Sequence, residues 1–275
     1  MIKVKVLNIQ FDACTLQEAS RRVEDFLKSS EVRGGVQIVT PNPEMLLQAQ
    51  KNPPFAQVLN RAWMSVADGA GVLWASTFQR SVKAGWSSMR RCVTGIRLLI
   101  LLLLQPKKCR GVFPERVTGV DLMGHIAIVA SRLNVPIFLL GASEGVAEKV
   151  AAVLKKHSPK LIVAGTFAGS PHEDDFPALQ ARIAETRPGV LFVAYGSPAQ
   201  ELWIARHLHE LPSVRIAMGV GGAFDFIARI RKRAPHWMRS LGLEWLYRLV
   251  QEPSRWRRIW NATVKFPLMV IRGIK

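Results

Sequence analysis

The chain is poor in the features that mark disulfide-linked, zinc-binding or membrane-spanning proteins. Its 275 residues include three cysteines, Cys14, Cys92 and Cys109, which form no C-x-x-C pair, and no histidine pair has the spacing of zinc ligands. No stretch has the layout of a signal peptide, and the longest aliphatic run, Leu98–Leu104, is far shorter than the roughly 20 residues that cross a bilayer. We therefore expect a protein of a reducing compartment with no metal site and no transmembrane helix.

Acidic residues are scarce in two segments. The formal net charge is +18, from 38 Lys and Arg against 20 Asp and Glu. Residues 80–116 hold nine basic residues and one acidic residue, and residues 229–275 hold twelve and two, while the remainder of the chain holds seventeen of each sign. A single-sign excess of this size indicates an anionic partner such as phospholipid, nucleic acid or a nucleotide. The partner is expected to meet these two segments rather than the neutral body.

Short β-rich runs alternate with helical patterns between residues 36 and 220. This alternation predicts a doubly wound, Rossmann-like α/β fold with a mostly parallel sheet. Two helix starts look like capping boxes, Thr15–Glu18 and Ser197–Gln200, the second with proline at the first helical position. The expected strands are Val36–Thr40, Met64–Ala67, Val135–Leu140, Leu161–Ala164, Val190–Ala194 and Val214–Met218.

Five loops follow the carboxyl ends of expected strands. In such folds ligands collect there, because helix N-termini favour anions, so we expect one crevice lined by all five loops. The glycine turn in the third loop is not G-x-G-x-x-G, and no acidic residue is suitably placed for a nicotinamide ribose, which argues against a dinucleotide cofactor. The loops are Thr40–Glu44, Asp68–Gly71, Gly141–Gly145, Gly196–Glu201 and Gly219–Asp225.

Two aspartates in these loops are candidates for chemistry. Asp68 follows an apolar strand, so its carboxylate is expected to face the crevice, where it could act as a general base. An N-cap for a helix over residues 70–78 is an alternative of about equal weight. Asp225 has the same ambiguity. The glycines of these loops either admit a nucleotide close to the backbone or satisfy turn geometry: Gly196, Gly219, Gly221 and Gly222.

Beyond residue 229 the alternation stops and the composition turns to Trp, Arg and Leu. In Trp237–Val250 apolar residues recur at helical spacing, and Pro253 starts another helix that combines arginines with tryptophans. Such helices lie in membrane interfaces. Residues 80–116 repeat this chemistry, as a second surface-seeking element or a hairpin insertion at the edge of the crevice. A solvated helix face and nucleic-acid binding are the alternatives, and the interleaved tryptophans and aliphatic residues favour a membrane.

A set of motifs in order along most of the chain closely resembles the WecG/TagA/CpsF glycosyltransferases. Members of this family build bacterial surface polymers such as wall teichoic acid, enterobacterial common antigen, and capsule or exopolysaccharide. A set this long is highly specific. The motifs are Thr40–Glu44, Ala67–Val72, Arg116–Leu122, Leu139–Gly141, Gly196–Glu201, Val220–Phe226, Arg233–Pro235 and Leu243–Leu249.

The resemblance implies an inverting transfer, without a metal or cofactor. The sugar would be N-acetylmannosamine, a related N-acetylated hexosamine or its uronic acid, moved from a UDP donor to polyprenyl-diphosphate-linked N-acetylglucosamine. It implies a peripheral protein on the cytoplasmic face of the cell membrane, with an anionic membrane surface as partner. A homo-oligomer is left open, and no nucleic acid is expected. The alternative is a basic nucleic-acid-binding protein without enzymatic activity.

The resemblance also implies roles for residues at matching positions. Asp68 would be the general base that deprotonates the acceptor hydroxyl, with Thr40 and Asn42 lining the same pocket. Substrate, including the donor or its diphosphate, would be held from the loops and the segment before them by Arg116, Gly141, Gly196, Gln200, Gly222 and Asp225. A C-terminal appendage that docks on the membrane and helps to close the active site would supply Arg248, Arg255 and Arg258.

Two substitutions and one insertion depart from the family pattern. Ala199 stands where members usually carry lysine, and Arg229 stands where they carry glycine. The basic segment at about 80–113 is largely an insertion, which could strengthen membrane docking. The changes bear on the donor sugar more than on the reaction type. We expect an α/β core over residues 1–228 that includes this insertion, and a helical appendage over residues 229–275.

Overall fold

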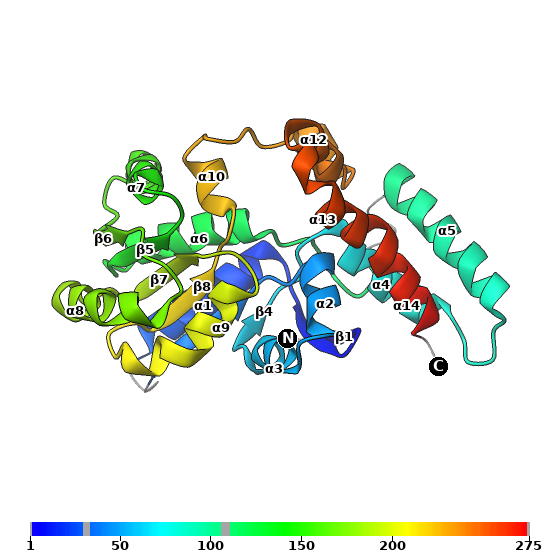
Figure 1. The fold of residues 1–275 in the computed structure, drawn as a ribbon, viewed down its shortest axis with the longest axis horizontal. Coiled ribbons are helices and arrows are strands. Elements are labelled where there is room, and N and C mark those ends of the chain that lie inside the picture. Colours follow the sequence, from blue (N-terminus) through cyan, green and yellow to red (C-terminus); the bar gives the residue numbers. More distant parts are fainter. Residues whose placement is uncertain (1, 30–33, 106–110, 274–275) are drawn as a thin grey trace.

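A parallel sheet of six strands forms the centre of the computed structural model, which describes residues 2–29, 34–105 and 111–273 (Figure 1). The strand order is β4-β3-β8-β7-β5-β6, and every neighbouring pair is parallel. The predicted α/β fold is confirmed, and each predicted strand is present, Val190–Ala194 with the predicted bounds and the other five with shifted ends. The strands are β3 (Val36–Val39), β4 (Met64–Ser65), β5 (Ile137–Gly141), β6 (Val163–Phe167), β7 (Val190–Ala194) and β8 (Ile216–Gly219).

Helices cover both faces of this sheet because its strands are apolar on both sides. In β5, Ile137 and Leu139 point into one core cluster while Phe138 and Leu140 point into another, as the alternation of side chains along a strand requires. The first cluster is closed by α1 (Leu16–Lys28), α6 (Gly119–Arg132), α7 (Val146–His157) and α10 (Ala223–Ile227). The second is closed by α8 (Phe176–Thr186) and α9 (Ala199–His207).

The residues before α1 form an antiparallel hairpin that the sequence analysis did not predict. Leu7 and Asn8 have φ values of 45° and 67°, the left-handed pair that a two-residue hairpin turn needs. Asp12 is buried and accepts the backbone N–H of Ser65 at 3.0 Å, which ties the hairpin to β4. The α1 helix then begins with the predicted capping box at Thr15. The two strands are β1 (Ile2–Val6) and β2 (Ile9–Ala13).

A third core cluster lies beside the sheet and contains side chains of the segment predicted as an insertion. Its helices are α2 (Pro43–Ala49), α3 (Pro53–Arg61), α4 (Ala70–Ser81), α5 (Ser88–Leu104) and α14 (Phe266–Arg272). Figure 1 shows α5, the helix of the insertion, at the outer edge of the molecule beside α14. Residues 106–110, which include Cys109, lie outside the described residues; Cys14 and Cys92 are free thiols.

The C-terminal segment is helical, as predicted, but the pattern over Trp237–Val250 is divided into two helices. The break includes Gly242, whose φ is +73° and where a Cβ would lie 2.9 Å from the Cβ of Ala70. A helical run starts at Pro253, as predicted, and ends in α14, where Phe266 is fully buried. The segment comprises α11 (His236–Ser240), α12 (Glu244–Gln251), η4 (Pro253–Arg255), α13 (Trp256–Trp260), the π-helical turn η5 (Asn261–Lys265) and α14.

Within the described ranges, no helix combines the length and the apolar composition needed to cross a membrane.

Candidate active site

A cavity of about 520 Å³ lies between the C-terminal helices, α5 and the loops that follow β3 and β4. Its volume is in the usual range for a site that takes a small molecule, roughly 300–1,000 Å³. Three carboxylates and four guanidinium groups face this one space. Among the predicted site residues, the cavity brings together Asn42, Asp68, Arg116, Arg248, Arg255 and Arg258.

Asp68 lies in the wall of the cavity, directly beyond β4. Its backbone N–H donates to the carbonyl of Pro41 at 3.2 Å, so the loops after β3 and β4 support each other. The N-cap of α4 is Gly69, and no side chain caps that helix, so the alternative role of Asp68 as the cap is wrong. The backbone N–H of Gly119, the first residue of α6, donates to Asp68 Oδ2 at 3.3 Å.

The surroundings of Asp68 give its carboxylate an unusual acidity. Burial raises the pKa of Asp68 above the ordinary aspartate value, and the negative charge of Glu244 raises it further. The positive charges of Arg116 and Arg248 and the N–H of Gly119 act in the opposite direction, but burial outweighs them. A carboxylate with a raised pKa is a stronger base than an ordinary aspartate. The site therefore provides a buried carboxyl group that takes up a proton more readily than an ordinary aspartate.

Thr40 and Asn42 come from the loop after β3. A Cβ added to Gly119 would come within 3.1 Å of Thr40 Oγ1, which places this hydroxyl beside the contact between Gly119 and Asp68. Asn42 Oδ1 accepts the backbone N–H of Met45 at 3.0 Å and caps α2. The Asn42 side chain also lines the cavity, so one residue starts a helix and faces the site.

Carboxylates hold two of the arginines in position along the C-terminal helices. Arg258 Nε donates to both carboxylate oxygens of Glu44, at 2.8 and 3.0 Å, which joins α13 to α2. Arg255 Nε donates to Glu252 at 2.5 Å. These pairs leave the remaining N–H groups of each guanidinium for a ligand, because a guanidinium has five donors.

Arg116 and Arg248 flank the third carboxylate of the cavity, Glu244. The closest nitrogen–oxygen distances are 3.9 Å for Arg116 and 3.6 Å for Arg248. The guanidinium of Arg248 also stands over the ring of Phe226, 4.6 Å from its centroid, a favourable cation–π arrangement. The positive charges of both arginines lower the pKa of Asp68, so both act on the candidate base.

The loops after β5, β7 and β8 lie at the same edge of the sheet but are absent from the lining of this cavity. The predicted single crevice lined by all five loops is therefore not what this cavity forms. Gln200 joins two of these loops, since its Oε1 accepts the N–H groups of Gly196 and Gly221 at 3.1 and 2.9 Å. The predicted capping box at Ser197–Gln200 is wrong, because α9 begins after Pro198 and no side chain caps it.

The loop glycines differ in whether the backbone requires glycine or whether the missing side chain leaves open space. Gly141 has a φ of +93°, and a Cβ there would lie 2.9 Å from the carbonyl carbon of Ala194, so the backbone requires glycine. Gly196 has a φ of +79°, with open space where a Cβ would stand. Gly222 has a φ of −71° and equally open space, so its backbone does not require glycine. The space at Gly196 and Gly222 leaves room for a ligand near the backbone.

Asp225 is connected to the cavity through a chain of ion pairs. Its carboxylate lies 3.3 Å from Arg231 Nε, Arg231 Nη1 lies 2.8 Å from Glu252, and Glu252 accepts from Arg255 of the cavity. Arg229, where the family pattern has glycine, has a φ of +57°. The position keeps the left-handed conformation that glycine favours, so the glycine of the family pattern fits a backbone demand.

An ion pair that was not predicted from the sequence lies on α6, the helix that contacts Asp68. Arg233 donates to both oxygens of Asp121, at 2.6 and 2.8 Å, and to Thr118 Oγ1 at 3.1 Å. Burial alone would raise the pKa of Asp121, but the bonds from Arg233 and Thr118 lower it below the ordinary value. The pair fixes the first turn of α6, the helix whose Gly119 contacts Asp68. The spacing of Thr118 and Asp121 was the available signal, because it is that of a helix cap.

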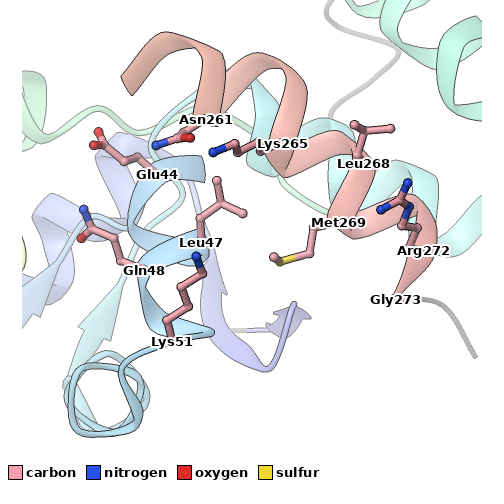
Figure 2. Close-up of a pocket in the computed structure, with 10 residues that line it drawn as sticks. All are labelled: Glu44, Leu47, Gln48, Lys51, Asn261, Lys265, Leu268, Met269, Arg272 and Gly273. Carbon is pink, nitrogen blue, oxygen red and sulfur yellow. The ribbon is translucent and has the colours of Figure 1, made fainter. Parts of the chain in front are cut away.

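A second cavity, of about 560 Å³, lies between α2 and α14 (Figure 2). Lys51, Lys265 and Arg272 surround an apolar floor that includes Leu47 and Met269. The carboxylate in its lining is Glu44, which is already paired with Arg258. This cavity therefore has no candidate base to match Asp68. Among the described residues, no group of three or more His, Cys, Asp and Glu side chains is arranged to hold a metal ion.

The chain belongs to the WecG/TagA/CpsF family of glycosyl transferases, whose model matches residues 4–108 and 92–275. It is therefore a glycosyltransferase, and the family resemblance of the motifs is confirmed. The two matched ranges overlap over residues 92–108, inside the segment predicted as an insertion. Similar proteins include the N-acetylglucosaminyldiphosphoundecaprenol N-acetyl-beta-D-mannosaminyltransferases of Staphylococcus aureus strains MW2 and MRSA252. Each is 30% identical over 257 residues, which cover 94% of this chain and 87% of the relative.

Proposed function

We propose that this chain transfers N-acetylmannosamine, or a related N-acetylated hexosamine or its uronic acid, from a UDP-sugar to polyprenyl-diphosphate-linked N-acetylglucosamine. The names of the Staphylococcus aureus relatives contain this sugar and an acceptor of this class. The observation that carries the proposal is the cavity in which Asp68, with its raised pKa, stands among four arginines. The product would enter a cell-surface polysaccharide or teichoic acid.

In the proposed reaction, the Asp68 carboxylate takes the proton of an acceptor hydroxyl. The hydroxyl oxygen forms a bond to the anomeric carbon of the donor, and the bond from that carbon to the diphosphate of UDP breaks on the opposite face. The leaving oxygen takes the electron pair, and the configuration at the carbon is inverted. Arg116 and Arg248, which line the cavity with Asp68, stabilise the charge on the leaving diphosphate without a metal ion.

The donor nucleotide is proposed to lie over the loops after β8, β7 and β5. In the sheet order these loops follow directly after that of β3, so a nucleotide there would present its sugar toward Asp68. The helices after β5 and β7 lie on opposite faces of the sheet, which makes this pair of strands a topological switch point, where α/β folds bind ligands. The open space at Gly196 and Gly222 supports the placement.

The reaction is proposed to take place at the cytoplasmic face of the cell membrane, with the protein bound peripherally. The insertion helix α5 presents an apolar stripe at helical spacing, and each member is at least 53% exposed: Met89, Val93, Ile96, Ile100 and Leu104. Arginines occupy the same helix, and Trp256 and Trp260 of α13 are also exposed. Exposed apolar stripes with basic residues and tryptophan favour the interface of an anionic membrane.

The stripe predicts a measurable effect on membrane binding. The double variant Ile96→Ser/Ile100→Ser is expected to bind anionic vesicles of phosphatidylglycerol at least about tenfold more weakly, because two apolar side chains no longer enter the lipid. Co-sedimentation with vesicles measures the effect. The matched control is Ile128→Ser. Ile128 lies on α6, in the part of the chain with balanced charge, and is 47% exposed. Equal binding by the double variant and the wild type would show that α5 does not dock.

The transfer itself is tested with a panel of UDP-N-acetylhexosamines and N-acetylglucosamine-diphosphate acceptors on short lipid chains. We expect UDP-N-acetylmannosamine or a close relative to give a disaccharide with inverted anomeric configuration, assigned by NMR coupling constants. The rate should be unchanged by a chelator such as EDTA. UDP-N-acetylglucosamine is the comparison donor. The absence of transfer from every donor would exclude the proposal, and dependence on a divalent cation would exclude its metal-free form.

A further inference from the structure

The lining of the cavity around Asp68 has a charged part and an apolar part. Asp68, Glu44, Glu244 and the four arginines form the charged part, and the group of apolar residues that includes those of α5 is called the apolar end. The apolar end is lined by Trp74 of α4, by Leu99 and Leu102 of the insertion helix α5, and by Val264 and Pro267 of the C-terminal helical run. The insertion therefore forms part of the wall of the candidate active site itself.

The C-terminal helical run shows the same change in chemistry along its length. Residues of this run line the cavity in groups that recur every three or four positions, the spacing of one helix face. The first two are cationic and the later ones are mostly apolar, in the order Arg255, Arg258, Ile259, Ala262, Thr263, Val264 and Pro267. A ligand lying along this face would have its anionic group next to the arginines and an apolar group beyond it.

The α5 helix is fixed where it closes the apolar end. The indole Nε1 of Trp74 donates to the carbonyl of Gly95 at 3.2 Å, which ties α5 to α4. A Cβ at Gly95 would lie 2.8 Å from the side chain of Ile271 on α14, so α5 and α14 are in close contact. Leu102 is only 8% exposed. The wall is therefore set by packing, while the opposite face of α5 carries the exposed stripe.

From these features we infer that the insertion helix binds the isoprenoid chain of the acceptor. The inference rests on the proposed function and names the part of the acceptor that Leu99 and Leu102 recognise. The order of groups along the cavity matches the acceptor: sugar at Asp68, diphosphate at Arg255 and Arg258, and the first isoprene units between α5 and the C-terminal run. One face of α5 then binds the membrane, and the other face binds the isoprenoid chain of the substrate.

The test uses water-soluble acceptors in the absence of membranes. N-acetylglucosamine diphosphate is linked to a methyl, a geranyl or a farnesyl group, and KM is measured for each. For the wild type, KM is expected to fall at least about tenfold from methyl to farnesyl, because the isoprenoid group leaves water for the apolar end of the cavity. In Leu99→Gln/Leu102→Gln most of this ratio is expected to be lost. The methyl acceptor is the internal reference for an intact fold.

Two further variants sharpen the result. Leu99→Trp keeps the wall apolar but fills the apolar end of the cavity. It is therefore expected to reduce the ratio of KM for the methyl acceptor to KM for the farnesyl acceptor, even if the double glutamine variant does not fold. Ile128→Gln on α6 introduces the same kind of polar change outside the cavity and is expected to keep the wild-type ratio. A wild-type KM independent of the chain, or an unchanged ratio in the folded Leu99 variants, would overturn the inference. No transfer to any of the three acceptors would instead refute the proposed function.

Discussion

Replacement of Asp68 by asparagine is expected to lower kcat for sugar transfer by about a hundred- to ten-thousandfold, the range that a general base contributes. Asparagine keeps the shape of the side chain and can still accept the N–H of Gly119, but it cannot take the proton of the acceptor hydroxyl. Binding of the UDP-sugar, measured by titration calorimetry, is expected to stay close to the wild-type value. Asp68→Ala should give the same loss of kcat.

The control for this experiment is Asp174→Asn, which changes an exposed aspartate away from the cavity. Thermal unfolding gives a second check. Because burial raises the pKa of Asp68 in the folded state, its ionised form opposes folding at neutral pH and its protonated form favours folding at low pH. Asparagine removes that cost, so the midpoint of unfolding should not fall. In the wild type, activity should decline as the pH drops through the raised pKa. Unchanged turnover in Asp68→Asn would exclude this residue as the base.

The double variant Arg255→Ala/Arg258→Ala is expected to lower kcat/KM for the diphosphate acceptor by about a hundredfold or more, because each hydrogen bond to a charged group contributes roughly 1.5–3 kcal/mol. Both guanidinium groups face the cavity, and both are oriented by carboxylates, Glu252 and Glu44. Initial rates with a soluble short-chain acceptor measure the effect without a contribution from membrane binding.

Arg257 provides the matched control, because it lies between these two arginines in sequence but is absent from the cavity lining and stands over the ring of Trp256. Arg257→Ala is expected to keep the wild-type kcat/KM with the soluble acceptor. Lysine at 255 and 258 should restore only part of the activity, since an ammonium group lacks the planar fork of a guanidinium. Equal losses in the Arg257 variant and the double variant would contradict a specific role for the pair.

The fold could be predicted where local pattern determines structure. The six central strands are short apolar runs between helical patterns, and the capping box at Thr15 depends on residues three apart. The hairpin before α1 was missed although its strands alternate in polarity around Leu7 and Asn8. The interruption at Gly242 was also missed. It depends on the close approach of Ala70, a residue of another helix, so the local sequence around Gly242 does not indicate it.

The candidate site could be predicted only in part, for a related reason. The loops with Asn42 and Asp68 meet because their strands are neighbours, and the strand pattern indicated this. The remaining loops share the sheet edge but do not line the cavity, although β8 is also paired with β3. The cavity is completed by α5 and the C-terminal helices, and α5 and α14 pack with the helices that follow β3 and β4. The pairs Arg258–Glu44 and Arg233–Asp121 join residues far apart in sequence, so they follow from tertiary packing. The roles assigned to individual residues remain predictions.

The burial of α14 has a consequence for how the enzyme is made. Phe266 and Val270 are buried in the same cluster as the hairpin strands β1 and β2, so the last helix of the chain packs with the first two strands. Arg258, in the helical run that ends in α14, is paired with Glu44 of α2, another helix of this cluster. A nascent chain lacks this packing until α14 has left the ribosome. Translation that stops before α14 would therefore yield a chain that contains Asp68 and Arg258 but not the helix whose packing joins the run of Arg258 to the rest of the cluster.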